Sequence, residues 1–127
     1  MRTALFLVVL SLLSLLSAPR SGLAKAQEEQ VDIVEPGETT SWGYSPTSAT
    51  VPVGTTVVWT NTGSVVHSVT SQDQFFDSKL LDPGKSWSYT FETPGTYRYF
   101  CVPRPWMKGT VIVTSGEEPP PRPAATP

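Results

Sequence analysis

Few side chains in this sequence could bind a soft metal ion, and three of them have a spacing that favours copper. His67 is the only histidine, Cys101 is the only cysteine, and Met107 follows Cys101 by six positions. An imidazole, a thiolate and a thioether together form a ligand set that suits copper. Arg104 lies between the two sulfur-bearing residues, where a second imidazole would be expected, and a guanidinium cannot ligate a cation.

The loop that carries these residues is short and conformationally restricted. Pro103 and Pro105 limit its backbone and reduce the entropy that is lost when the loop becomes ordered. A rigid loop of this kind can hold copper ligands in one geometry. Each residue alone also fits a structural role: His67 as a hydrogen-bonded strand residue, Cys101 as a small buried side chain and Met107 as a core residue.

Short β-strands are the elements that must position these side chains. Pro/Gly turns separate runs of β-branched and aromatic residues, and no helical periodicity extends over a useful length. We expect strands at 31–34, 49–54, 55–61, 65–70, 86–91, 96–101 and 109–114. His67 then lies within a strand and Cys101 ends one, so the two could meet only where non-adjacent strands pack side by side. The pattern predicts an all-β antiparallel Greek-key sandwich of about seven to eight strands.

The predicted core lies on alternating positions of these strands. We expect it to contain Val57, Trp59, Val69, Phe91, Tyr97 and Val111, and to form without a metal ion.

The N-terminal segment has the layout of a secretory signal peptide. An apolar run at 4–16 follows Arg2, and Ala24-Lys25-Ala26 forms a small-x-small cleavage pattern. Residues 1–26 are therefore predicted to be a signal peptide, 27–115 one domain and 116–127 a Pro-rich disordered tail. An uncut membrane anchor is the alternative at the N-terminus. After cleavage no stable membrane anchor is expected, and the location is periplasmic or secreted.

Charge and cysteine content limit the possible functions. Cleavage leaves 101 residues, with six basic and eleven acidic side chains and a formal charge of −5. This balance argues against a nucleic-acid partner, because no basic stripe can neutralise phosphates. The single cysteine cannot form an internal disulfide, so in an oxidising compartment it is buried, paired between chains or bound to a metal. No nucleophile–base pair or carboxylate pair indicates an enzyme.

Residues 49–114 resemble the small blue-copper proteins of the plastocyanin and amicyanin family, the cupredoxins. The resemblance rests on motifs in the same order: GTTVVWTN (54–61), HSVT (67–70), FDS (76–78), LDPG (81–84), TF (90–91), PGTY (94–97), YFC (99–101) and MKGTV (107–111). It implies a Greek-key sandwich that holds one copper ion through His67, Cys101 and Met107. It also implies a monomeric one-electron carrier with a redox partner protein. Ser68 matches a residue, usually Asn, that links the two ligand loops in that family.

Arg104 departs from the family pattern, because the matching residue there is a second histidine ligand. Two outcomes are open: a weakened copper site made by His67, Cys101 and Met107, or a metal-free domain. Besides the electron carrier, two rival functions follow. One is a copper-free binding module that uses Arg104 with Pro103, Pro105 and Trp106 as interface residues. The other is a Cu(I) delivery or storage protein.

Overall fold

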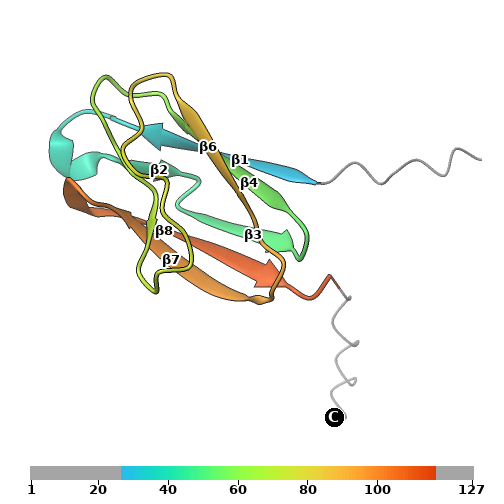
Figure 1. The fold of residues 1–127 in the computed structure, drawn as a ribbon. Helices are drawn as coiled ribbons and strands as arrows, with labels where there is room; N and C mark the ends of the chain where they lie inside the picture. Colours follow the sequence, from blue (N-terminus) through green and yellow to red (C-terminus); the bar gives the residue numbers. More distant parts are fainter. Residues whose placement is uncertain (1–26, 117–127) are drawn as a thin grey trace, which may run out of the picture.

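The computed structural model describes residues 27–116, which form two four-stranded β-sheets packed face to face (Figure 1). One sheet has the strand order β2-β1-β4-β6 and the other the order β3-β8-β7-β5. The elements are β1 (Glu28–Val34), the short 3-10 helix η1 (Thr39–Ser41), β2 (Gly43–Ser45), β3 (Ser48–Pro52), β4 (Thr56–Asn61), β5 (Thr70–Ser71), β6 (Ser86–Thr90), β7 (Gly95–Cys101) and β8 (Arg104–Thr114). The predicted all-β sandwich is confirmed.

Two of the six strand pairings are parallel, whereas the sequence analysis expected an antiparallel sandwich. They join β1 to β4 and β3 to β8, and the other four pairings are antiparallel. The β1–β4 pair places Ile33 opposite Asn61. The residues that follow β1 therefore lie beside the loop that follows β4, which matters for the site described below.

The core follows the alternation of the strands. Along β4, Val57, Trp59 and Asn61 are buried and alternate with less buried residues. Five of the six predicted core residues are buried, namely Val57, Trp59, Val69, Phe91 and Val111.

Tyr97 is the exception among the predicted core residues, because it is only half-buried. It lies near the start of β7, where its hydroxyl donates to the carbonyl of Thr93 at 2.6 Å, and Tyr99 is the fully buried tyrosine of that strand.

The predicted strand at 65–70 is wrong. His67 forms only an isolated bridge with Leu81, and the regular strand β5 is limited to Thr70–Ser71. Side chains replace the missing ladder: Asn61 donates to the carbonyl of Val65 at 2.8 Å, and the N–H of Val69 donates to the Ser78 hydroxyl at 2.8 Å.

Two other strand boundaries also differ from expectation. The stretch 38–48, in which no strand was expected, contains β2, and the last strand begins at Arg104 rather than at Gly109. It begins early because Cys101 pairs directly with Arg104 across a two-residue turn.

The predicted signal peptide at 1–26 and the predicted tail beyond Gly116 lie outside the described residues. Within 27–116 there is no helix with the length and hydropathy needed to span a membrane.

Candidate metal centre

His67 is held in the sandwich by its own backbone and is completely buried. Its N–H donates to the carbonyl of Leu81 at 3.1 Å, and its carbonyl accepts from the N–H of Leu81 at 2.7 Å. These two bonds fix the backbone on which the imidazole is carried, although no regular strand extends through this position.

Glu35 contacts the imidazole, and the sequence analysis did not assign this residue to the site. Its Oε1 lies 2.8 Å from His67 Nε2 and 3.1 Å from the N–H of Val65. Its Oε2 accepts from the N–H and the hydroxyl of Ser64 at 2.9 and 2.8 Å. A Cβ atom at Gly63 would overlap this carboxylate, so the absence of a side chain at position 63 leaves room for it.

The hydrogen bonds around Glu35 keep its carboxyl ionised. Burial alone would raise its pKa, but the N–H of Ser64, the His67 ring, the Ser64 hydroxyl and the N–H of Val65 together lower the pKa of Glu35 to about 2. An ionised carboxylate can only accept hydrogen bonds. The His67 ring therefore presents an N–H at Nε2 to this carboxylate, and Nδ1 is the ring nitrogen left to act as a ligand.

Cys101 ends β7, and its sulfur faces that free nitrogen. The Sγ atom lies 3.6 Å from His67 Nδ1, and Cys101 is fully buried. A metal ion typically lies roughly 2.0 Å from an imidazole nitrogen and roughly 2.3 Å from a thiolate sulfur. If the N–metal–S angle is about 110–120°, the nitrogen and the sulfur are then roughly 3.6–3.8 Å apart. The observed separation fits a shared metal ion.

Ser68 links the segments that carry the two residues. Its hydroxyl accepts from the N–H of Val102 at 2.8 Å, which ties the residue after His67 to the residue after Cys101. Its carbonyl accepts from the buried Tyr44 hydroxyl at 2.6 Å. Burial is the main reason that the pKa of Tyr44 is raised, so this hydroxyl stays protonated and remains a donor.

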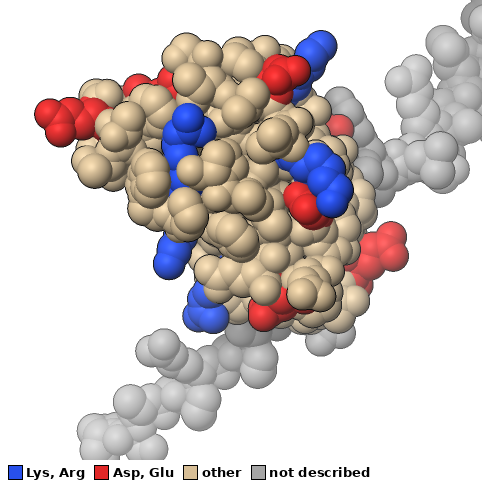
Figure 2. Space-filling model, turned by 60° about the vertical axis from the view of Figure 1, so that its left-hand side comes forward, with Lys and Arg blue, Asp and Glu red and all other residues tan. Residues whose placement is uncertain are grey.

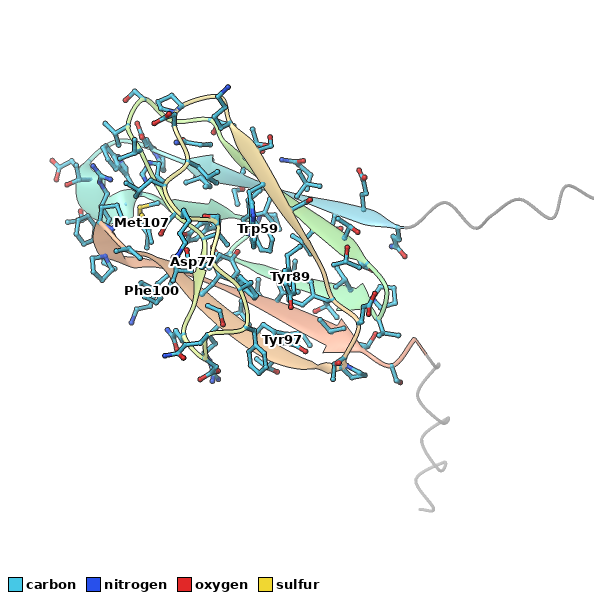
Figure 3. All side chains as sticks on the ribbon, in the orientation of Figure 1. Trp59, Asp77, Tyr89, Tyr97, Phe100 and Met107 are labelled. Atoms are coloured by element: carbon cyan, nitrogen blue, oxygen red, sulfur yellow. The ribbon has the colours of Figure 1, made fainter. Side chains whose placement is uncertain are left out.

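Met107 lies on β8 close to Cys101 in the sheet register. The register shifts here, because Phe100 pairs with Lys108 whereas the next residue, Cys101, pairs with Arg104. Residues 105–107 of β8, including Met107, therefore have no partner on β7. The side chain is fully buried in the same core cluster as Cys101. Figure 3 labels Met107 near the end of the sandwich where β7 turns into β8. Within residues 27–116 no three side chains from His, Cys, Asp and Glu gather as a metal site, so a site here depends on this thioether.

Arg104 is partly buried and held on one side of the cluster. Its Nη1 donates to the carbonyl of Val66 at 2.8 Å, and its guanidinium carbon lies 5.3 Å from the centroid of the Trp42 ring. The Trp42 ring also meets the His67 ring edge-on, with centroids 5.9 Å apart. Trp42 thus contacts both the arginine and the imidazole.

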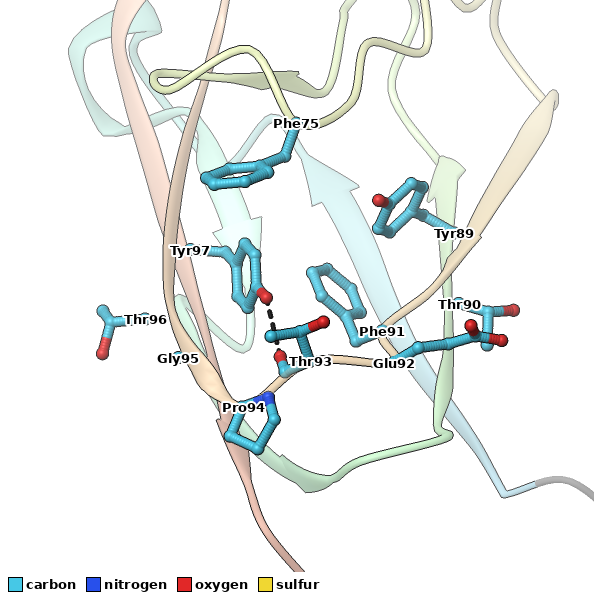
Figure 4. Close-up of a pocket in the computed structure, with 10 residues that line it drawn as sticks. All are labelled: Phe75, Tyr89, Thr90, Phe91, Glu92, Thr93, Pro94, Gly95, Thr96 and Tyr97. Atoms are coloured by element: carbon cyan, nitrogen blue, oxygen red, sulfur yellow. Dashed lines mark hydrogen bonds between the residues drawn. The ribbon is translucent and has the colours of Figure 1, made fainter.

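A hollow of about 510 Å³ lies elsewhere, at the end of β7 opposite Cys101 (Figure 4). Aromatic rings line much of it, including Phe75, Tyr89, Phe91 and Tyr97. None of the chemistry-bearing residues from the sequence analysis contributes to it, so it is separate from the candidate metal centre.

Replacing Glu35 by glutamine tests the support of His67. Glutamine has the same shape as glutamate, but an NH2 group replaces one of the two carboxylate oxygens. That group is a donor facing the donors of either His67 or Ser64, so at least one hydrogen bond is lost. We expect Glu35→Gln to lower the stability of the metal-free protein by about 1–3 kcal/mol and to weaken copper binding about 10- to 100-fold. Urea unfolding and a chelator competition measure the two effects.

The matched control for this variant is Glu38→Gln, because Glu38 is exposed and lies outside the His67 contacts. Gly63→Ala should reproduce the effect of Glu35→Gln by displacing the carboxylate. Equal stability and equal copper affinity in the Glu35 and Glu38 variants would show that the carboxylate does not support the imidazole.

Comparison with known proteins gives consistent matches. The model of the cupredoxin-like domain family matches residues 4–113. Amicyanin-alpha of Methylorubrum extorquens is 28% identical over 118 residues, covering 89% of this chain and 99% of the relative. The plastocyanin of Scenedesmus fuscus is 35% identical over 83 residues, covering 55% of this chain and 85% of the relative.

Solved structures agree with these sequence matches. A purple cupredoxin from Nitrosopumilus maritimus has a TM-score of 0.63 at 39% identity, covering 67% of this chain and 98% of its own. The Cu(I) form of an amicyanin variant has a TM-score of 0.60 at 28% identity, covering 73% of this chain and 87% of its own. These relatives are small cupredoxins and not enzymes, which confirms the expectation that this chain is not an enzyme. The chain belongs to the cupredoxin-like domain family.

Proposed function

We propose that this protein is a one-electron carrier that binds a single copper ion through His67, Cys101 and Met107. The observation that carries the proposal is the meeting of His67 Nδ1 and Cys101 Sγ at 3.6 Å, while His67 Nε2 is occupied by Glu35. Only Nδ1 is free to ligate, and it faces the one thiol of the chain. Copper, when bound, supplies a one-electron couple between Cu(I) and Cu(II).

The residues around the ligands favour a stable geometry. Glu35 fixes the orientation and the tautomer of the His67 ring, as carboxylates commonly do for metal-binding histidines. Ser68 holds the two ligand-bearing segments together through the N–H of Val102. Small changes in ligand positions between oxidation states favour fast electron transfer, and a buried, cross-linked cluster limits such changes.

Arg104 takes the position of the second histidine ligand in this proposal. With one imidazole, one thiolate and one thioether, the donor set is soft and low in coordination number, and it favours Cu(I) over Cu(II). The site is therefore weaker for Cu(II) than a site with two imidazoles.

The proposed setting is outside the cytoplasm, as a monomer that exchanges electrons with a partner protein. In one view of the surface, acidic and basic side chains are scattered over the described domain without forming a basic stripe (Figure 2). This distribution and the formal charge of −5 expected after cleavage favour a protein partner over nucleic acid.

Export is tested by mass analysis of the mature N-terminus. We expect the exported chain to begin at or near Gln27, because Ala24-Lys25-Ala26 fits a cleavage site. Exported protein that still contains residues 5–16 would contradict this prediction.

Copper reconstitution tests the proposed function. The purified protein is loaded with Cu(I) or Cu(II), its copper content is measured, and the loaded protein is examined by voltammetry. We expect a single copper ion per chain and a reversible one-electron wave. Both should disappear in Cys101→Ser, which is nearly isosteric. A correctly folded protein that takes up no copper would favour the copper-free binding module instead.

A further inference from the structure

Arg104 has unused hydrogen-bonding capacity and no acidic partner among residues 27–116. The ion pairs within that range join His67 to Glu35 and Lys79 to Asp77. A guanidinium has five N–H donors, and the contacts of the described chain use one of them, on Val66. A partly buried cation with free donors is a ready site for an anion.

The backbone pairing and the Trp42 contact place Arg104 beside the candidate metal centre. Cys101 and Arg104 are direct partners across the two-residue turn between β7 and β8, and residues opposite each other in an antiparallel pair point to the same face. Arg104 is partly exposed, whereas the Cys101 thiol is fully buried. The guanidinium carbon lies 5.3 Å from the centroid of the Trp42 ring, and that ring also meets the His67 ring edge-on.

We propose that Arg104 binds a small monovalent anion such as chloride. This anion would supply copper with the fourth ligand that the chain lacks beside His67, Cys101 and Met107. The inference rests on the proposed copper function. The guanidinium contributes charge and N–H donors, and the anion contributes the lone pair that a guanidinium cannot offer. Arg104 is thus a binding residue for the anion rather than a vacant ligand position.

Electrostatics predicts which oxidation state the anion favours. Cu(II) with one thiolate keeps a net positive charge, to which Arg104 adds another, whereas Cu(I) with one thiolate is neutral. An anion between them relieves more repulsion in the Cu(II) form. Glu35 is ionised and offsets part of this charge from the Nε2 side of the His67 ring, but its oxygens are engaged by His67, Ser64 and Val65 and are not free to serve as the missing ligand.

Copper titration in two salts tests the inference. The full protein is titrated with Cu(II) against a chelator in sodium chloride and in sodium perchlorate at equal ionic strength, since perchlorate is a poor ligand. Chloride that binds only to the Cu(II)-loaded protein stabilises that form. At a chloride concentration of about ten times the Kd of chloride for this form, the apparent affinity for Cu(II) rises about tenfold. The affinity for Cu(I) should change little. Azide is colourless when free, but bound to Cu(II) in place of chloride it should add a charge-transfer band to the visible spectrum.

Variants of Arg104 separate the anion site from a general salt effect. In Arg104→Gln the chloride effect should vanish, and in Arg104→Lys it should be retained in part because the charge remains. Near-UV circular dichroism checks that each variant is folded. Equal Cu(II) affinity in the two salts, or an equal chloride effect in the wild type and Arg104→Gln, would overturn the anion site but leave the copper proposal standing. Failure to bind copper in either salt would overturn both.

Discussion

Replacing Arg104 by histidine is expected to produce a protein that binds Cu(II) tightly and is intensely blue. The substitution removes a cation from beside the candidate metal centre and adds an imidazole nitrogen. In the wild-type protein, copper should give no colour or a weaker and different colour. Visible absorption spectroscopy of the two copper-loaded proteins measures the difference, because charge transfer from the Cys101 thiolate to copper gives the blue colour.

The fold already places position 104 where a histidine could become a copper ligand. Arg104 follows a two-residue turn and pairs with Cys101, so a side chain at position 104 starts beside the thiol and on the same face. His67 and Cys101 already meet at 3.6 Å. Losing the Arg104 contacts to Val66 and Trp42 should cost little fold stability, because Arg104 is only partly buried and begins β8 at the end of the sandwich.

Arg104→Ala is the control, since it removes the charge without adding a ligand. Its colour should stay weak, and added imidazole should restore part of it. The chloride dependence of copper binding should also disappear in Arg104→His, because the imidazole takes the place of the anion. A folded Arg104→His protein that remains colourless with copper would show that the β7–β8 turn does not form a copper-binding loop.

Replacing Trp59 by alanine is expected to lower the free energy of unfolding by about 3–5 kcal/mol. Trp59 is completely buried, and its ring lies within 6.4 Å, centroid to centroid, of four other aromatic rings: Phe76, Trp87, Phe91 and Tyr99. Alanine would leave a cavity at the centre of this aromatic cluster, in contact with both sheets. Urea unfolding of the metal-free protein measures the loss as a shift of the midpoint.

Trp59→Phe is the matched control, because it retains an aromatic ring. Trp59 Nε1 is buried and has no hydrogen-bond partner among the described residues, so phenylalanine removes ring area without breaking a hydrogen bond. We expect a markedly smaller loss than in the alanine variant. Similar losses in both variants would indicate that the core needs the full size of the indole and that a smaller aromatic ring does not fill the site.

The same aromatic core should keep the metal-free protein folded. None of the core residues around Trp59 is a proposed ligand, and the two sheets are closed by backbone pairing. Near-UV circular dichroism should therefore change little when a copper chelator is added. A collapse of the signal would mean that the metal organises the core.

Local alternation was sufficient to predict most of the sandwich. Val57 and Trp59 on β4 and Val111 on β8 alternate with less buried residues, and period-two alternation directly indicates a half-buried strand. The segment around His67 was mispredicted for a physical reason. Val65 and Val69 have the same alternation, but side chains of Asn61 and Ser78 satisfy their backbone groups in place of a strand partner.

The candidate site was only partly predictable. His67, Cys101 and Met107 were evident because each is a rare, soft donor in this chain, and the structure brings His67 and Cys101 into contact. Glu35 was not found because its contact with His67 spans 32 positions in the sequence. It depends on the parallel pairing of β1 with β4, and no local pattern reveals a parallel pair. Gly63, two positions after the predicted end of the strand at 55–61, was the one available hint that another side chain needs space there.

X-ray absorption at the copper edge of the Cu(I)-loaded protein tests the central claim most directly. The proposed site predicts sulfur scatterers from Cys101 and Met107 in the first shell, together with the imidazole pattern of His67. The thiolate contribution should be lost in Cys101→Ser. A first shell of oxygen and nitrogen alone, unchanged in Cys101→Ser, would contradict the proposed copper site.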